Sequence, residues 1–488
     1  MTAVIWPHNF SGTIRIPASK SHTIRRLIIA TLADGVSDLE HPLDSLDTRS
    51  CVSVCRALGA EITEYRGNDP SSPNPEDEKG EKLLRWTVKG AGAAYRNNSS
   101  GGEIKHCDVG NSGTTLFLIL AAAALGNEPV EFDGDEQIRR RSAGPLLEAL
   151  SGLGISVKSA ANGCAPITVC GPWKGGRVSL SCQTSQYLSA LLLAAPLAPD
   201  GVVTEIDLPL LNEKPYIRMT LSYLDAQGIP YEAAPDFSWF RIPGGSKWKP
   251  LSEPIPSDFS SAAFPAAAAA ISGGPVTLLG LDPNDTQGDK AFFSFIEKMG
   301  CRVKWEQVPI EQVSLGQFIT TGLRAIGQKS LELTFAEWQL TVSRNGSLKG
   351  GKFDLNDTPD LLPAMAALAC YAKSDTALTN VAHARLKETD RIIVMAEELG
   401  KLGIKTTELP DGLIIHGNGE NKPEISRPKY AAGGTGKTKK TDGRSDHRIV
   451  MALACAALGC TLPVEIAGAE SVAVTYPGFL DLLGAEFT

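Results

Sequence analysis

The sequence predicts an α/β protein of two similar domains, each made of three similar units around buried helices. Its 488 residues are about three times a typical domain length, which indicates two or more domains. A composition of 42% hydrophobic and 21% charged residues is typical of a globular chain. The third observation is a pair of helix patterns that recurs six times along the chain.

The outer helix of each unit is predicted from a glycine. An amphipathic segment runs into this glycine and is followed by a short apolar strand, and glycine suits the left-handed cap that ends a helix. The six predicted stops are Gly59, Gly154, Gly228, Gly300, Gly403 and Gly484.

The inner helix of each unit precedes the outer one and is rich in Ala and Leu almost all round. A helix without a polar face is buried on every side. Each inner helix opens on a polar cluster, and the six clusters are residues 19–21, 110–114, 183–186, 257–260, 356–360 and 445–448. Each unit therefore needs strands between an inner and an outer helix.

Three polar segments are predicted to be surface loops, namely residues 66–82, 96–103 and 417–444. They are dense in Gly, Pro, Ser, Asn and charged residues.

Composition excludes several classes of function. With 47 basic and 55 acidic side chains the net charge is -8, so no overall basic field holds nucleic acid or an anionic membrane. The longest apolar stretches, such as residues 116–125, are shorter than the ~20 residues that cross a bilayer. The N-terminus carries no secretory pattern, and the ten cysteines form no CxxC pair. We expect a cytoplasmic protein with reduced cysteines and no metal.

Cations cluster at the predicted helix openings. Lys20 lies in the first opening with Arg25 shortly after it, the three arginines 139–141 open an outer helix, and Arg448 lies in the last opening. For a single arginine a solvated face is the ordinary interpretation. Because helix N-termini themselves attract anions, the recurrence of cations there favours a site for a small polyanion.

Two acids lie among the same cations. Asp360 belongs to the fifth opening, and Glu388 lies between Lys387 and Arg391. A carboxylate beside cations stays ionised and can act as a base, whereas burial can make it an acid. The residues alone thus indicate a two-domain enzyme acting on anionic, phosphorylated small molecules, and they leave the reaction open.

From about Ile14 to Phe479 the chain resembles the 5-enolpyruvylshikimate-3-phosphate synthase family, the 3-phosphoshikimate 1-carboxyvinyltransferases. The motifs that carry the resemblance are residues 17–21 with Arg25, 110–114, 139–141, 184–186, 214–216, 287–289, 387–391 and 446–448. The resemblance implies the enolpyruvyl transferase fold, an inside-out α/β barrel with three βαβαββ units in each lobe. It further implies lobes of residues 19–254 and of 1–18 plus 255–488, with the active site in the cleft between them.

The resemblance also implies a reaction. Such enzymes transfer the enolpyruvyl group of phosphoenolpyruvate to the 5-hydroxyl of shikimate 3-phosphate and release phosphate. The reaction is an addition and elimination through a tetrahedral intermediate, on the shikimate pathway to chorismate and the aromatic amino acids. No metal or organic cofactor, nucleic acid or membrane is implied, and we expect a monomer.

By motif position the resemblance assigns roles to single residues. Asp360 takes the hydroxyl proton, and Glu388 together with Lys20 moves the protons at C3 of phosphoenolpyruvate. The residues expected to hold shikimate 3-phosphate are Lys20, Ser21, Arg25, Thr184, Ser185, Gln186, Asp360 and Lys387, of which Thr184, Ser185 and Lys387 bind its phosphate. Those expected to hold phosphoenolpyruvate are Lys20, Gly113, Arg141, Gln186, Arg391 and Arg448.

Four positions depart from the family pattern. Phe117 replaces an Arg, His383 replaces an Asn, and Val474 replaces a Lys that in many members helps to bind phosphoenolpyruvate. Glu213 stands where many members have a phosphate-binding Ser. A carboxylate ~4 Å from a phosphate costs roughly 4 kcal/mol per charge pair at an effective dielectric near 20, so Glu213 must turn away or pair with a cation.

These departures leave two alternatives. One is the related enzyme that acts on UDP-N-acetylglucosamine, which carries a Cys in the loop where residues 133–138 have none. The other is a catalytically silent relative that serves as a binding protein.

The resemblance leads to two further expectations. We expect ligand binding to close the lobes. We also expect glyphosate to compete with phosphoenolpyruvate, because Gly113 has no methyl group to crowd that site.

Overall fold

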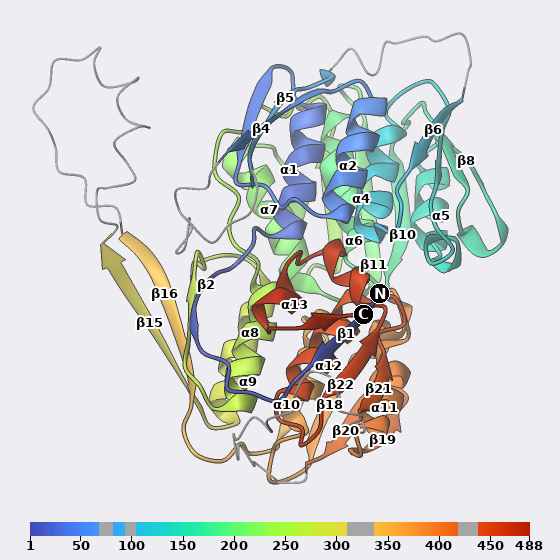
Figure 1. Cartoon of the computed structure of the whole chain (residues 1–488). Helices are drawn as coiled ribbons and strands as arrows, with labels where there is room; N and C mark the ends of the chain where they lie inside the picture. Colours follow the sequence, from blue (N-terminus) through green and yellow to red (C-terminus); the bar gives the residue numbers. More distant parts are fainter. Residues whose placement is uncertain (68–81, 93–103, 310–335, 418–437) are drawn as a thin grey trace, which may run out of the picture.

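The computed structural model describes residues 1–67, 82–92, 104–309, 336–417 and 438–488. Helices and strands alternate through six small sheets, and buried residues form two separate hydrophobic cores. The first core includes residues from Ile24 to Ile255, and the second joins Ala3 and Ile16 to residues from Phe259 to Leu483. We call the elements around these cores the first and the second lobe (Figure 1).

The second unit of the first lobe has the complete βαβαββ pattern. Its sheet has the order β6-β7-β9-β8, in which β6 and β7 are parallel and the other neighbours are antiparallel. Its elements are β6 (Lys105–Asp108), α4 (Gly113–Ala123), β7 (Val130–Asp133), α5 (Gly144–Gly152), β8 (Ser156–Ser159) and β9 (Ile167–Cys170).

Two further units repeat this order. The third unit comprises β10 (Gly176–Cys182), α6 (Gln186–Ala194), β11 (Val203–Leu211), α7 (Lys214–Gln227), β12 (Glu232–Ala233) and β13 (Trp239–Pro243). The fifth unit comprises β17 (Lys352–Asp354), α10 (Leu362–Ala369), β18 (Thr376–Thr379), α11 (Arg391–Lys401), β19 (Lys405–Leu409) and β20 (Gly412–His416).

The first unit has a smaller sheet. It comprises α1 (Lys20–Leu32), β3 (Val36–Glu40), α2 (Leu46–Ala57), β4 (Glu61–Gly67) and β5 (Lys82–Lys89), with the strand order β3-β5-β4. This sheet has no strand from the residues ahead of α1, where Ala18 makes an isolated bridge with Ser257. The uniform βαβαββ expectation therefore holds only in part for this unit.

The N-terminal strands complete the two remaining units. β1 (Thr2–Ile5) pairs with β22 and β23, and β2 (Gly12–Arg15) pairs in parallel with β14. The fourth unit adds α8 (Phe259–Ser272), β14 (Val276–Leu279), α9 (Ala291–Lys298), β15 (Cys301–Pro309) and β16 (Ala336–Arg344). The sixth adds β21 (Lys439–Asp442), α12 (His447–Ala457), β22 (Val464–Ala467), α13 (Phe479–Leu482) and β23 (Glu486–Phe487). The two chain termini consequently lie side by side (Figure 1).

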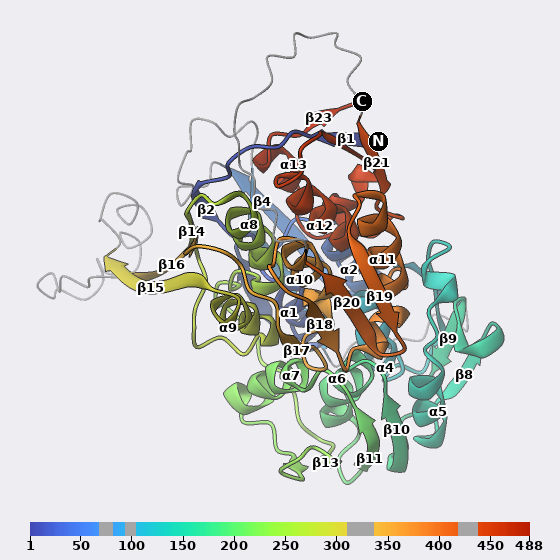
Figure 2. The ribbon, with the colours of Figure 1, turned by 90° about the horizontal axis from the view of Figure 1, so that it is seen from below.

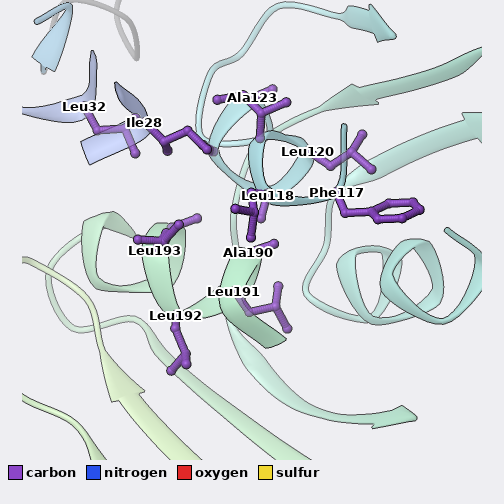
Figure 3. Close-up of a cluster of buried hydrophobic side chains, with 14 of the residues drawn as sticks. Ile28, Leu32, Phe117, Leu118, Leu120, Ala123, Ala190, Leu191, Leu192 and Leu193 are labelled. Carbon is purple, nitrogen blue, oxygen red and sulfur yellow. The ribbon is translucent and has the colours of Figure 1, made fainter. Parts of the chain in front are cut away.

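The inner helices form the centre of each lobe, as the sequence predicted. In the first lobe, Ile28 of α1, Leu118 of α4 and Leu191 of α6 come together (Figure 3). In the second lobe α8, α10 and α12 pack on one another (Figure 2), and every residue of these three helices is buried. Side chains buried on every face explain the absence of a polar stripe in these segments.

The outer helices end where predicted. All six stop glycines have positive φ, from 65° at Gly484 to 102° at Gly59. This backbone conformation is readily adopted by glycine and rarely by other residues.

Two of the loop predictions are wrong in part. Residues 439–442 form strand β21, which pairs in parallel with β22, although their sequence Lys-Lys-Thr-Asp is polar. The pairing is made by backbone groups, and only Thr441 of this strand is buried. Residues 66 and 67 also belong to β4, and residue 82 begins β5. Residues 68–81, 96–103 and 418–437 of the predicted loops lie outside the described residues. No helix among the described residues is long and apolar enough to span a membrane.

Candidate active site

A small cavity between the lobes collects most of the predicted site residues. Its volume is about 30 Å³, and it adjoins a larger cavity of about 1090 Å³. The small cavity is lined by Lys20, Ser21, Arg25, Thr114, Arg141, Ser185, Gln186, Glu213, Tyr216, Asp360, Lys387, Glu388, Arg391 and Arg448. Thr184 lines the larger cavity, which also contacts Arg141, Gln186, Lys387 and Glu388.

The ends of helices position many of these side chains. Lys20, Gly113, Gln186 and Arg391 are each the first residue of a helix. At four of the inner helices the N-cap side chain accepts a hydrogen bond from the helix backbone: Ser19 at α1, Ser112 at α4, Asp258 at α8 and Asp446 at α12. The N-termini of several helices, with the cationic side chains beside them, therefore surround one cavity. The partial positive charge of helix N-termini favours the binding of an anion there.

Arg391 organises the side of the site that belongs to the second lobe. Its side chain is 1% exposed, and its guanidinium donates to Asp446 at 2.8 and 3.2 Å, to Asp360 at 2.8 Å and to Glu388 at 2.6 Å. Burial lowers the pKa of Arg391, but the three carboxylates, Asp446 first, raise it far above its ordinary value. Arg391 therefore stays charged while it fixes both predicted catalytic acids.

Asp360 is held as a carboxylate by three cations. Its oxygens lie 2.8 Å from Arg391, 3.1 Å from Arg448 and 4.0 Å from Lys387. Burial alone raises the pKa of Asp360, but Arg448, Lys387 and Arg391 together lower it far below the ordinary value. Asp360 is accordingly a carboxylate at neutral pH and can accept hydrogen bonds.

Glu388 joins the two lobes electrostatically. Its carboxylate contacts Arg391 of its own lobe and lies 3.8 Å from Nη1 of Arg141 in the first lobe. Burial raises the pKa of Glu388, but Arg391, Arg141 and His447 lower it well below the ordinary value. Glu388 is therefore ionised in this arrangement.

Arg141 has unused donors. In the part of the chain that the structure describes, its buried Nε and Nη1 atoms have no hydrogen-bond partner. Buried donors without partners are rare in native proteins and mark a place where a ligand acceptor belongs. A Cβ atom added to Gly113 would lie 2.4 Å from the guanidinium carbon of Arg141, so glycine is what lets this side chain reach the cavity.

The first-lobe cations Lys20 and Arg25 differ in their partners. Lys20 Nζ lies 3.1 Å from Oδ2 of Asp47, whose pKa is raised by burial although Lys20 opposes this. Arg25 donates to neutral groups, including the Thr220 hydroxyl at 2.9 Å and the Ser189 hydroxyl at 3.2 Å. Burial lowers the pKa of Arg25 to about 10. Arg25 thus keeps its charge although it forms no short-range ion pair with any residue that the structure describes.

Glu213 pairs with a cation, one of the two outcomes expected for it. One carboxylate oxygen lies 2.6 Å from Nζ of Lys387, which belongs to the other lobe. The second oxygen accepts from Ser185 N at 2.9 Å, Ser185 Oγ at 2.8 Å and Thr184 Oγ1 at 3.1 Å. Burial raises the pKa of Glu213, but Lys387 and His383 lower it below its ordinary value.

The other three departures have distinct surroundings. Phe117 packs edge-on against Tyr187 with ring centroids 5.3 Å apart, and the Arg141 guanidinium lies 5.7 Å from its ring centroid. His383 lines the larger cavity, and burial lowers its pKa. Val474 is buried, 8% exposed, and lines neither cavity.

Sequence reasoning missed several partners of the site residues. Asp47 was not singled out, and Asp446 was named only within the last opening and the motif 446–448, although each pairs with a site cation. Asp289 belongs to a quoted motif, and its carboxylate accepts from Ser260 and from the Tyr216 hydroxyl. A search for acids in the first turn of each predicted helix would have found Asp47 and Asp446. No group of three or more potential metal ligands occurs within the described ranges.

Fold and site together define a class of protein: a two-lobed α/β protein in which cations at helix ends of both lobes line one cavity suited to small polyanions. The chain belongs to the EPSP synthase (3-phosphoshikimate 1-carboxyvinyltransferase) family, whose model matches residues 6–483.

Relatives span nearly the whole chain. The 3-phosphoshikimate 1-carboxyvinyltransferase of Acetivibrio thermocellus is 43% identical over 97% of this chain and 95% of its own length. The protein of the same name from Ruminiclostridium cellulolyticum is 40% identical over the same shares. A solved EPSP synthase from Acinetobacter baumannii superimposes with a TM-score of 0.72 at 25% identity, covering 99% of this chain and 97% of that one. These findings confirm the family and fold that the motifs predicted.

Proposed function

We propose that this chain transfers the enolpyruvyl group of phosphoenolpyruvate to the 5-hydroxyl of shikimate 3-phosphate and releases phosphate. One observation carries the proposal: Lys20, Arg25 and Arg141 of the first lobe share one small cavity with Lys387, Arg391 and Arg448 of the second. An acidic protein that gathers cations from two lobes around two ionised carboxylates is suited to join two polyanions.

Shikimate 3-phosphate is proposed to lie against the first lobe. Lys20, Ser21, Arg25 and Gln186 line the cavity there, and Thr184, Ser185 and Lys387 offer donors to its phosphate. Asp360 faces them from the second lobe. This arrangement would hold the ring with its 5-hydroxyl toward Asp360.

Phosphoenolpyruvate is proposed to lie beside Arg141, Arg391 and Arg448, with Lys20, Gln186 and the backbone at Gly113 around it. The unpartnered donors of Arg141 support this placement, because they lack acceptors among the described residues. Gln186 is positioned by a hydrogen bond of 3.0 Å to Thr114, in the first turn of α4.

The proton steps follow from the charge of each group. Asp360 accepts the proton of the 5-hydroxyl as that oxygen attacks C2, which C3 protonation has made electrophilic. Lys20, as an ammonium, can donate to C3. Glu388 is an ionised carboxylate beside Arg391 and Arg141, so it can accept the proton that the methyl group loses in the later step in which phosphate leaves.

The lobes and the setting of the enzyme complete the proposal. We propose lobes of residues 19–254 and of 1–18 plus 255–488, a monomer, and a place in the cytoplasm on the pathway to chorismate. All ten cysteines are free, as suits a reducing compartment. Light scattering during size-exclusion chromatography measures the oligomeric state.

A coupled assay of phosphate release tests the function. Phosphate is expected only when both substrates are present, in an amount equal to the enolpyruvyl product. A chain that binds shikimate 3-phosphate without releasing phosphate from phosphoenolpyruvate would be the silent relative. Turnover with UDP-N-acetylglucosamine in place of shikimate 3-phosphate would identify the related transferase instead.

A further inference from the structure

The Glu213 carboxylate occupies a ready-made anion site. It accepts three hydrogen bonds from Thr184 and Ser185 and forms an ion pair of 2.6 Å with Lys387. Charge-assisted bonds of this length are the strong ones in proteins. Every donor to Glu213 therefore belongs to the set that the proposed function gives to the phosphate of shikimate 3-phosphate.

The local fold holds Glu213 in this position. It is the residue before α7, 2% exposed, with φ of 58° and ψ of 41° in the left-handed region. Residues other than glycine are uncommon in this region. An ionic network that satisfies both carboxylate oxygens can maintain such a conformation, and the same network connects the first lobe to Lys387 of the second.

A phosphate and this carboxylate cannot use the same donors together. The small cavity, about 30 Å³, has room for only a few water-sized groups. The two anions would also repel each other at this short range. Space for a displaced carboxylate exists close by, because the larger cavity borders Thr184, His383 and Lys387.

We propose that Glu213 is an internal substitute for the phosphate of shikimate 3-phosphate, which the substrate must displace in order to bind. This inference rests on the proposed function and adds a specificity-determining residue to it. A dianionic phosphate can take the donors from a single carboxylate, whereas shikimate without the phosphate leaves the carboxylate in place. Glu213 thus weakens binding of the phosphorylated ligand and leaves that of the bare ring unchanged.

Two ligands and three variants test the inference. Calorimetric titration compares shikimate 3-phosphate with shikimate on the wild type, Glu213→Gln, Glu213→Ser and Asp357→Asn. Removing a competing charged hydrogen-bond network is expected to tighten shikimate 3-phosphate roughly tenfold or more in both Glu213 variants. Shikimate is expected to bind all four proteins alike. Asp357 is the matched control, because its carboxylate also joins the lobes, accepting from Lys214 N at 3.3 Å without contacting the phosphate donors.

Distinct outcomes separate this inference from the proposed function. Equal or weaker binding of shikimate 3-phosphate in both Glu213 variants overturns it, and so does an equal gain for shikimate. Phosphate release by the wild type is measured in parallel. Absence of turnover would contradict the proposed function, while a gain confined to the phosphorylated ligand would still support the role of Glu213. Two replacements of different size are used so that a folding defect in one leaves the other informative.

Discussion

At the scale of single residues, the charge of the site acids follows from their immediate neighbours. Asp360 contacts three cations and stays ionised despite its burial. Asp289 accepts hydrogen bonds from the hydroxyls of Ser260 and Tyr216, and burial together with Asp360 raises its pKa to about 7. Two aspartates of one site thus have opposite shifts because their partners differ.

The replacement Asp360→Asn tests the proposed base. It preserves the shape of the side chain and removes its ability to accept the hydroxyl proton, so kcat is expected to fall about 10²- to 10⁴-fold. Steady-state phosphate release measures kcat, and denaturant unfolding checks that the variant is folded. A kcat within twofold of the wild-type value would exclude Asp360 as the base.

The buried acid Asp289 predicts a pH dependence of stability. A carboxyl group whose pKa is higher in the folded than in the unfolded chain stabilises the fold at low pH, and this contribution is lost as pH rises from about 4 to about 7. The wild type loses this contribution on going from pH 5 to pH 8, whereas Asp289→Asn has no such group to titrate. The unfolding free energy of Asp289→Asn minus that of the wild type is therefore expected to be larger at pH 8 than at pH 5, by on the order of 2 kcal/mol. Urea unfolding at both pH values measures the difference, and a constant difference would contradict the assignment.

Arg391 predicts a large stability effect. Arg391→Met leaves the buried carboxylates of Asp360, Glu388 and Asp446 without their shared cation, which is expected to cost on the order of 3–5 kcal/mol. Arg385→Met is the control, since the ion pairs of Arg385 are more exposed and such pairs contribute at most about 1 kcal/mol. Similar losses of unfolding free energy in the two variants would show that the buried ion pairs of Arg391 stabilise the fold no more than the exposed ones of Arg385.

Most of the predicted site residues line the small cavity, but the sequence did not predict how these side chains pair. Lys20, Arg141, Asp360 and Arg391 lie in short motifs that can be recognised one at a time. The contact of Glu213 with Lys387 joins residues 174 positions apart. No feature of the sequence around either residue predicts a contact between them. The sequence therefore predicted only that Glu213 must turn away or pair with a cation.

At the scale of elements, the helices were more predictable than the strands. Buried inner helices lack a polar face, and outer helices end at a glycine. Both features can be recognised within a short stretch of sequence, one or two helical turns long. Strand β21 is polar, and its neighbour β22 starts more than twenty residues later, so its pairing has no local signal. The missing first strand of the first unit likewise depends on where distant segments of the chain lie.

The start of α4 predicts the effect of a single methyl group. In Gly113→Ala the new Cβ would meet the Arg141 guanidinium at 2.4 Å, so Arg141 must move away from the cavity. The KM for phosphoenolpyruvate is expected to rise about tenfold or more, in line with the loss of one charged hydrogen bond, with a smaller change for shikimate 3-phosphate. Inhibition by glyphosate, if it competes at this site, is expected to weaken as well. Steady-state kinetics with each substrate varied in turn measures the effects, and an unchanged KM for phosphoenolpyruvate would place that substrate away from Arg141.

At the scale of the whole molecule, the two lobes meet through charges of opposite sign. The Glu213 pair with Lys387 and the Glu388 contact with Arg141 both cross the gap, where the remaining cations of each lobe also converge. Substrate anions add negative charge between these cations, so they favour closure, and closure excludes water from the reaction. Glu213 contributes part of that negative charge from the protein itself.

Small-angle X-ray scattering tests this balance. The radius of gyration of the wild type is expected to decrease when shikimate 3-phosphate and an unreactive phosphoenolpyruvate mimic are added together. Glu213→Gln, which lacks the carboxylate that holds Lys387, is expected to be more open than the wild type before ligand is added and equally compact afterwards, because the substrate phosphate then supplies the missing charge. Asp357→Asn is expected to follow the wild type. A radius that ligands leave unchanged in the wild type would exclude ligand-driven closure, and identical radii for the unliganded wild type and Glu213→Gln would show that the internal anion does not hold the lobes together.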